Sequence, residues 1–320
     1  MAMSSKGEFG FIDFIKERFP SPDGVCGIGD DCAVIPSPPG ELLFSTDLLM
    51  EGVHFLREES SPEDIGWKAA AVNISDIAAM GGIPMATFLS IALPKDAQGE
   101  WAERFMEGYS QISRQFGVPL LGGDTTSSLR DIAVNVGILG RCQTGGRSMR
   151  SSAKVGEFIY VTGPLGDSAG GLHALLNGLE RSDDVDFLIG KHKRPIPRVK
   201  EGLALVKSGK VGAMMDISDG IASDLRHILK ASGAGAEVHL DRIPLSEPLR
   251  RVCDEHALDC HRFSTGGGED YELLFTAPDG IEDHLDFPVY QIGEIVPGDS
   301  LIWIQNGRTV DFDIKGYNHF

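Results

Sequence analysis

The stretch VGAMMDISDGIASDLRHILKA, residues 211–231, contains the unit from which the fold is built. It predicts a β-strand over 211–216 and an α-helix over 220–231. The acidic turn Asp216-Ile217-Ser218-Asp219-Gly220 joins the two. Because ligands of α/β proteins gather at strand ends, this turn is a candidate site. The plainer alternative is that Ser218 or Asp219 only caps the helix.

Five other short acidic clusters also lie beside glycines or small hydroxyl residues. They are Gly29-Asp30-Asp31, Ser45-Thr46-Asp47, Asn73-Ile74-Ser75-Asp76, Gly122-Gly123-Asp124-Thr125-Thr126 and Gly266-Gly267-Gly268-Glu269-Asp270. Carboxylates brought together raise one another's pKa values and destabilise a fold unless cations neutralise them. Magnesium takes hard oxygen ligands and bridges carboxylates to phosphates. The clusters therefore predict a magnesium-dependent enzyme that acts on a phosphorylated substrate.

Composition sets the broad class of the protein. The 320 residues exceed the usual size of a single core, so two domains are expected. The net charge of −18 argues against nonspecific nucleic-acid binding, which needs Lys and Arg. The five cysteines form no C-x-x-C pair, which favours reduced thiols in the cytosol. Since there is no secretory signal and no apolar run of ~20 residues, we expect a soluble, cytoplasmic protein without a membrane partner.

Strands and helices alternate along the chain, which predicts an α/β or α+β class. The predicted strands cover 42–49, 85–93, 119–121, 131–139, 158–162, 211–216 and 236–240. The predicted helices cover 97–116, 168–177, 199–207 and 220–231, and one more that Ser61 and Pro62 open and Gly81-Gly82 closes. Asn306-Gly307 predicts a type I′ hairpin within 301–312. We expect residues 181–197, which are rich in charge and proline, to form an exposed loop, and we place the domain boundary between residues 145 and 146.

Asp76 is the most informative single position. Helical spacing places it on the buried face with Ile65 and Ala69, near the end of a helix, where the macrodipole disfavours an anion. A lone aspartate there would be paired with Arg or Lys. The five other clusters favour a metal ion instead.

The remaining candidates each have a plainer alternative. Asp30 could lie in a solvated turn, and Asp47, at the C-terminal end of its strand, could be an N-cap. Gly123-Asp124 follows a short strand and could offer backbone amides to phosphate or form a plain turn. Tyr109 could be a core residue, His54 a surface histidine and Arg150 a linker charge. There is no Walker A or protein-kinase motif, so metals would hold any ATP.

Six motifs in order resemble those of the thiamine-monophosphate kinase family, within the aminoimidazole ribonucleotide synthetase superfamily. They are GIGDDCAV, STDLLMEGVHF, NISDIAAMGG, LGGDTT, DISDGIASDL and TGGGEDYELLFT, and the similarity continues to the C-terminal Gly316-Tyr317-Asn318-His319-Phe320. The resemblance implies two domains, 1–145 for ATP, metal and dimerisation and 146–320 to close the cleft. It also implies a homodimer formed through the N-terminal sheet.

The same resemblance implies roles for individual residues. The implied magnesium ligands are Asp30, Ser45, Thr46, Asp47, Asp76, Asp124, Asp216 and Asp219. The implied ATP contacts are Tyr109, Gly123, Asp124, Arg150 and Ser218. The implied contacts to thiamine phosphate are His54, Glu269 and Tyr317, although Tyr317 could simply anchor the chain end.

The implied reaction is direct in-line transfer from ATP to thiamine phosphate, with several magnesium ions and no protein nucleophile. One alternative is another ATP-dependent synthetase of the superfamily that activates an amide or a selenide. A second is a binding module without catalysis, but every expected metal aspartate is present.

Overall fold

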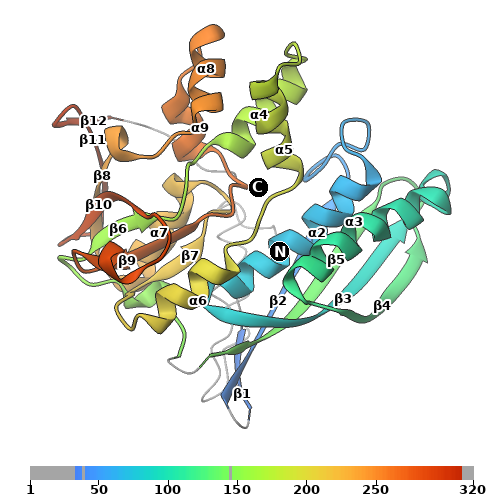
Figure 1. The fold of residues 1–320 in the computed structure, drawn as a ribbon, viewed down its shortest axis with the longest axis horizontal. Coiled ribbons are helices and arrows are strands. Elements are labelled where there is room, and N and C mark those ends of the chain that lie inside the picture. The colour runs from blue at the N-terminus through green and yellow to red at the C-terminus, as the bar shows by residue number, and fades with distance from the viewer. Residues whose placement is uncertain (1–32, 38–39, 144–145, 312–320) are drawn as a thin grey trace, which may run out of the picture.

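The computed structural model describes residues 33–37, 40–143 and 146–311, which form two β-sheets (Figure 1). The first sheet has the strand order β1-β2-β5-β3-β4, and the second has the order β12-β11-β8-β10-β6-β9-β7. We call the elements from β1 to β5 the N-terminal unit, and those from residue 150 to β12 the C-terminal unit. The boundary expected at residues 145 and 146 stays a prediction.

The N-terminal unit is a sheet with helices on one face (Figure 1). Its strands are β1 (Ala33–Ser37), β2 (Gly40–Met50), β3 (Gly82–Leu93), β4 (Leu120–Ser127) and β5 (Ala133–Cys142). Its helices are α2 (Pro62–Ala79) and α3 (Glu100–Phe116), with a 3-10 turn at Lys95–Ala97. Helix α3 lies within the helix predicted over 97–116, and its Phe105, Tyr109 and Ile112 are buried.

Helix α2 lies between the two units and is buried along most of its surface. The Ser61 hydroxyl accepts a hydrogen bond from Asp64 N at 3.2 Å, and Pro62 begins the helix, as the sequence predicts. Fifteen of its 18 residues are buried. Its neighbours are α3 and the first sheet on one side, and α6 and β7 on the other. The helix is therefore shared by the cores of both units.

The C-terminal unit combines the second sheet with two groups of helices. Its strands are β6 (Phe158–Val161), β7 (Met214–Asp216), β8 (Gly235–His239), β9 (Leu273–Ala277), β10 (Tyr290–Val296), β11 (Leu301–Gln305) and β12 (Arg308–Val310). Its helices are α4 (Asp167–Asn177), α5 (Asp183–Lys193), α6 (Val199–Lys207), α7 (Ile221–Ser232), α8 (Glu247–Glu255) and α9 (Cys260–Gly266), with 3-10 turns at Arg150–Ser152, Leu240–Arg242 and Ile281–His284. Helices α4, α5, α8 and α9 gather at the top of Figure 1 around a small core of their own.

The predicted hairpin near the end of the described chain is confirmed. Strands β11 and β12 are antiparallel, and Asn306 and Gly307 join them with φ values of 51° and 72°. Two consecutive left-handed residues are what a type I′ turn requires.

The prediction of a loop over 181–197 is wrong, because most of this segment is helix α5. The Ser182 hydroxyl accepts a hydrogen bond from Val185 N at 3.3 Å and so caps the helix start. Acidic residues fill its first turn and basic residues its last, which suits the helix dipole. Leu188 and Ile189 are buried. The charges that suggested a loop therefore stabilise the two ends of a helix.

Two strand boundaries also differ from the prediction. Ser45, Thr46 and Asp47 lie in the middle of β2 rather than at its end. The segment 122–124 is not a turn but part of β4, which pairs in parallel with β3. Gly123 lies so close to β3 that an added Cβ would be 1.7 Å from the Leu89 carbonyl oxygen. Glycine permits this close approach, so a turn was the wrong explanation for it.

None of the helices in the described ranges has the length and apolar character that crossing a bilayer requires.

Candidate functional site

A cleft of about 870 Å³ lies between the two units. One wall comes from β2 and the following segment 53–60, and the other from α4, α9 and the segment 266–271. Five of the predicted site residues line it: Asp47, His54, Ser218, Asp219 and Glu269. The volume is within the range typical of small-molecule sites. Residues from opposite ends of the chain therefore form one candidate site.

Serine hydroxyls connect three of the acidic clusters beside this cleft. Ser45 on β2 donates a hydrogen bond to Asp76 Oδ2 at 2.5 Å. Ser75 on α2 donates to Asp216 Oδ2, also at 2.5 Å. Helix α2 thus links the acidic cluster of the first sheet to that of the second, so three of the six clusters that the sequence singled out lie together.

Negative charge is concentrated around the buried side chain of Tyr271. Burial raises the pKa of this phenol well above its usual value, and the nearby carboxylates of Glu269, Asp47, Asp216 and Asp76 raise it further. Carboxylates this close together favour a bound cation, because it would relieve their mutual repulsion.

The segments 216–220 and 266–271 run side by side at the end of β7. Glu269 N donates a hydrogen bond to Ser218 O at 2.8 Å, and Tyr271 N donates to Ile217 O at 3.0 Å. An added Cβ on Gly268 would lie 2.3 Å from Ser218 O, so this approach requires glycine. The N-cap of α7 is Gly220, without a side-chain bond. The alternative that Ser218 or Asp219 caps this helix is therefore wrong.

Asp224, in the first turn of α7, is a buried acid that the sequence analysis missed. Its Oδ2 accepts a hydrogen bond from Asp219 N at 3.2 Å. Burial raises its pKa well above the usual value, and Asp219 and Asp216 add to the shift. Its position inside DISDGIASDL was the available signal. Asp224 holds the backbone of the segment that carries Asp219.

Lys68 and His192 were also missed, and both contact Glu269. Lys68 Nζ lies 3.1 Å from Glu269 Oε1 and 3.0 Å from Oε2. His192 Nδ1 lies 3.3 Å from Glu269 Oε2. A lysine inside the apolar run of α2 was the signal that could have identified the first contact. No local pattern identifies the second.

Several predicted residues do not line the cleft. The Tyr109 hydroxyl donates to Thr87 Oγ1 at 2.7 Å inside the core, where burial raises its pKa to about 12. Arg150 lies in a 3-10 turn of the C-terminal unit. Gly123 and Asp124 lie on the edge strand β4, three strands from β2 and so about 14 Å away. Asp30 and Tyr317 lie outside the described residues. The roles of all of these stay predictions.

The first sheet has an outer face that α2 and α3 do not cover. Thr46 points to this face and accepts a hydrogen bond from Asn135 Nδ2 at 2.8 Å. Large hydrophobic side chains are exposed on its strands: Phe44, Leu48, Met85, Phe88 and Leu121. Such an exposed group of apolar side chains is typical of an interaction surface.

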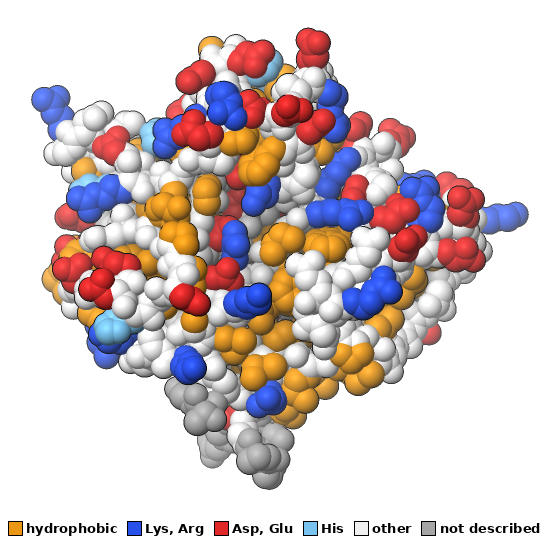
Figure 2. Space-filling model, viewed as in Figure 1, with side chains coloured by type: hydrophobic (Ala, Val, Ile, Leu, Met, Phe, Trp, Pro, Cys, Tyr) orange, Lys and Arg blue, Asp and Glu red, His pale blue; other side chains and the backbone are white. Residues whose placement is uncertain are grey.

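Charges of both signs are interspersed over the face of the molecule drawn in Figure 2. Lys and Arg lie beside Asp and Glu there, rather than in a continuous basic stripe. Binding to a nucleic-acid backbone depends on clustered positive charge. The described charges on this face therefore do not favour such a partner, and the net charge of −18 agrees.

The donor atoms beside the cleft fit magnesium. Asp47, Asp76 and Asp216 offer hard carboxylate oxygens, and Ser45 offers a hydroxyl. Within the described ranges, no group of three His, Cys, Asp or Glu side chains is close enough to form a metal site alone. Protein magnesium sites commonly use one or two carboxylates and take further ligands from substrate phosphates. The arrangement suits magnesium bound together with a phosphorylated ligand.

Comparison with known proteins gives full-length relatives. Residues 29–142 match the N-terminal domain of AIR synthase related proteins, and residues 154–304 match their C-terminal domain. The chain is 42% identical to the thiamine-monophosphate kinase of Salmonella typhimurium over 98% of both chains, and 36% identical to that of Aquifex aeolicus over 100% of both. It also matches a solved structure of AaThiL complexed with AMPPCP and TMP, with a TM-score of 0.90, 35% identity and coverage of 100% and 99%.

Proposed function

Because the chain belongs to the family of thiamine-monophosphate kinases, with the two domains of AIR synthase related proteins, we propose that it transfers a phosphoryl group from ATP to thiamine monophosphate. The products are ADP and thiamine diphosphate. The observation that carries the proposal is the cleft between the two units, where Asp47 and His54 face Ser218, Asp219 and Glu269.

The chemistry explains why the site holds many carboxylates. The accepting atom is a phosphate oxygen that is already ionised at neutral pH, so no general base is required. The protein has to bring two anions together in line and offset the charge that develops. Asp47, Asp76 and Asp216 alone would repel both substrates. Bound magnesium ions supply the positive charge that lets attacking and leaving oxygens approach.

The position of each residue relative to the cleft suggests its role. We assign the segment 216–220 and Asp47 to the metal and phosphate end of the site, since their oxygens lie beside the shared acidic region. Glu269 and His54 are assigned to the acceptor, because they lie on opposite walls of the cleft. Ser45 and Ser75 hold carboxylates in place through their hydroxyls. Asp124, Gly123, Arg150 and Tyr109 remain candidates for ATP.

We also propose a homodimer joined through the outer face of the first sheet. Phe44, Leu48 and Phe88 are exposed there, and a second copy of the same face would bury them. Thr46 and Asp124 lie on strands of that sheet, so the dimer would place ATP near the interface. The described cysteines, Cys142, Cys253 and Cys260, are free thiols, which fits the proposed cytoplasmic location.

The decisive experiment measures ADP release with competing acceptors. Thiamine phosphate, thiamine and an aminoimidazole precursor are offered with ATP and magnesium, and we expect turnover with thiamine phosphate alone. Removal of magnesium by EDTA should stop the reaction, and added magnesium should restore it. Asp47→Asn should abolish turnover without loss of fold. Turnover only with the aminoimidazole precursor would replace the proposal by a synthetase function.

A further inference from the structure

Lys68 is a buried cation in a helix whose buried side chains are mostly apolar. Only 3% of the residue is exposed, between Trp67 and Ala69 on α2. Removing an ammonium group from water costs several kcal/mol, and pairing seldom recovers more than this cost. An apolar residue would often serve the core as well. Stability therefore does not explain a lysine here.

Its partner, Glu269, comes from the opposite unit and faces the cleft. The Glu269 side chain is 27% exposed, so the carboxylate is accessible from the cleft that it lines. Its φ is +64°, a left-handed conformation that is costly for a residue with a side chain. Strain of this kind is concentrated at functional sites. The backbone and the ion pair together fix the direction of this carboxylate.

His192 on α5 also lies close to the same carboxylate. Its Nδ1 lies 3.3 Å from Glu269 Oε2 and 3.1 Å from Ser168 Oγ. Burial, together with the nearby Lys68 ammonium, lowers the pKa of His192 to about 4, so the ring is neutral at pH 7. A neutral ring can lie beside the carboxylate without adding charge. Three elements of the fold thus converge on one carboxylate.

The charge of Glu269 also depends on this arrangement. Burial is the largest influence and would raise its pKa, but Lys68, His192 and His54 together outweigh it, so the pKa lies below its usual value. Without the lysine, a half-buried carboxyl would tend to protonate. A protonated Glu269 would attract the positively charged thiazolium ring of thiamine less strongly. Lys68 keeps the acid ionised, and His192 helps to orient it.

We propose that Lys68 and His192 are positioning residues that hold the Glu269 carboxylate ready for the cationic ring of the acceptor. The inference rests on the function proposed above. Neither residue belongs to the part of the site assigned above to metal and phosphate. Their removal should therefore weaken recognition of the acceptor and leave recognition of ATP intact.

The test compares the KM values of both substrates in Lys68→Met. We expect the KM for thiamine phosphate to rise about tenfold, because loss of a charged hydrogen bond costs about 1.4 kcal/mol or more. The KM for ATP should change less than about twofold. Lys68→Arg, which keeps the charge, should recover part of the loss. An equal rise in both KM values would overturn the inference.

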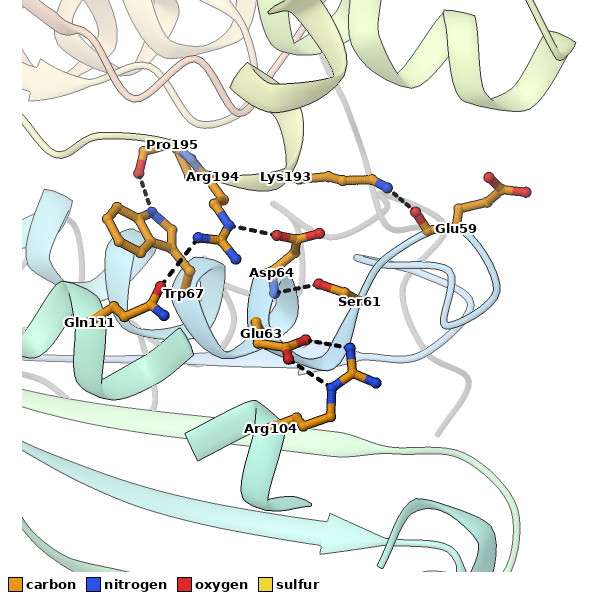
Figure 3. A network of polar contacts seen from close by, with 10 residues as sticks. All are labelled: Glu59, Ser61, Glu63, Asp64, Trp67, Arg104, Gln111, Lys193, Arg194 and Pro195. Atoms are coloured by element: carbon orange, nitrogen blue, oxygen red, sulfur yellow. Dashed lines mark hydrogen bonds and ion pairs between the residues drawn. The ribbon is translucent and has the colours of Figure 1, made fainter. Parts of the chain in front are cut away.

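Arg194 offers a matched control, drawn in Figure 3. It also joins α2 to the C-terminal unit, since its Nε lies 2.5 Å from Asp64 Oδ1, but it contacts Asp64, Gln111 and Trp67 rather than Glu269. Arg194→Met should leave both KM values at the wild-type level. A rise in the acceptor KM as large as that of Lys68→Met would mean that general loosening between the units explains the effect.

A double-mutant cycle separates action through Glu269 from a structural role. If Lys68 acts through Glu269, Lys68→Met combined with Glu269→Gln should raise the acceptor KM no more than Glu269→Gln alone. Additive effects would contradict the inference.

If Lys68→Met does not fold, His192→Asn tests the same prediction. The acceptor KM should then rise by a smaller factor, and an unchanged acceptor KM in this variant would refute the inference. If the wild-type protein does not turn over thiamine phosphate, the proposed function is refuted. If the wild-type protein is active and the acceptor KM of the variant is unchanged, only this inference is refuted.

Discussion

Helix α2 meets the C-terminal unit at two polar contacts that differ in their surroundings. At the rim contact, Asp64 and Trp67 bond to Arg194 and Pro195, as Figure 3 shows. At the inner contact, Lys68 and Ser75 bond to Glu269 and Asp216. The Arg194 side chain is 37% exposed, whereas that of Lys68 is 4% exposed. Neighbouring residues of one helix therefore serve two different environments.

The comparison separates groups that join the units from groups placed for chemistry. At the rim, donors and acceptors are bonded to one another, and Arg194 lies 5.6 Å from the centre of the Trp67 ring. At the inner contact, Asp216 and Glu269 belong to the group of carboxylates around Tyr271. Such crowding destabilises the protein on its own. Crowded carboxylates occur at the inner contact and not at the rim contact, and a bound cation would explain this difference.

The largest expected difference between the contacts is in turnover. Asp216→Asn should reduce ADP release by about a thousandfold or more, because it removes a proposed magnesium ligand. The amide oxygen still accepts the Ser75 hydroxyl, so the fold should be kept. The rim counterpart, Asp64→Asn, should retain a rate near that of the wild type. Comparable rates for both variants would remove the distinction between the contacts.

A pH dependence of stability should come from the inner contact through His192. Below about pH 6.5 the unfolded histidine binds a proton, whereas the folded one, with a pKa of about 4, does not. The unfolded state then holds more protons, so the free energy of unfolding falls as pH drops towards 4, by up to about 3 kcal/mol. His192→Asn, which cannot titrate, should lack this part of the fall. Urea denaturation of both proteins between about pH 7 and pH 4 measures it, and parallel curves would contradict the prediction.

At the rim contact, the expected effect is on stability alone. Trp67 Nε1 donates to the Pro195 carbonyl oxygen at 2.8 Å in a buried position. Trp67→Phe removes this donor and should lower the free energy of unfolding by about 1–2 kcal/mol. Both KM values should stay at the wild-type level. If the KM for thiamine phosphate rose in this variant, the rim would also be positioning substrate groups.

The smallest effect is expected further out in the same network. Arg104 forms a two-point ion pair with Glu63, 2.7 Å from Nε to Oε1, and its side chain is 47% exposed (Figure 3). Exposed ion pairs contribute little because water already solvates both charges. Arg104→Met should leave the thermal midpoint within the error of calorimetry. A clear drop would show that this surface ion pair holds α3 against α2.

How far the sequence predicted the fold depends on how local each signal is. Helix α2 was predicted correctly because Ser61 and Pro62 lie next to the residues that they order. Helix α5 was missed because its charges and the nearby prolines were given more weight than its cap at Ser182. The continuation of β4 through Gly123 was missed because its cause lies on another strand, at Leu89.

The candidate site shows the same limit. The acidic clusters were visible because carboxylates beside glycines form short local patterns. Lys68 and Glu269 are 201 positions apart, and nothing near either residue indicates the other. His192 lies in the segment taken for a loop, so its contact could not be inferred. Pairings made only in the folded chain are the part that a single sequence does not reveal.

The burial of α2 on nearly all sides has a consequence for how the protein is made. The helix ends at Ala79, whereas α6, which packs against it, begins at Val199. A ribosome therefore releases the first sheet and its helices well before the chain that covers the other side of α2. Until then the growing chain exposes an apolar helix surface of the kind that chaperones bind. The N-terminal unit cannot complete its core during synthesis without the unit that follows it.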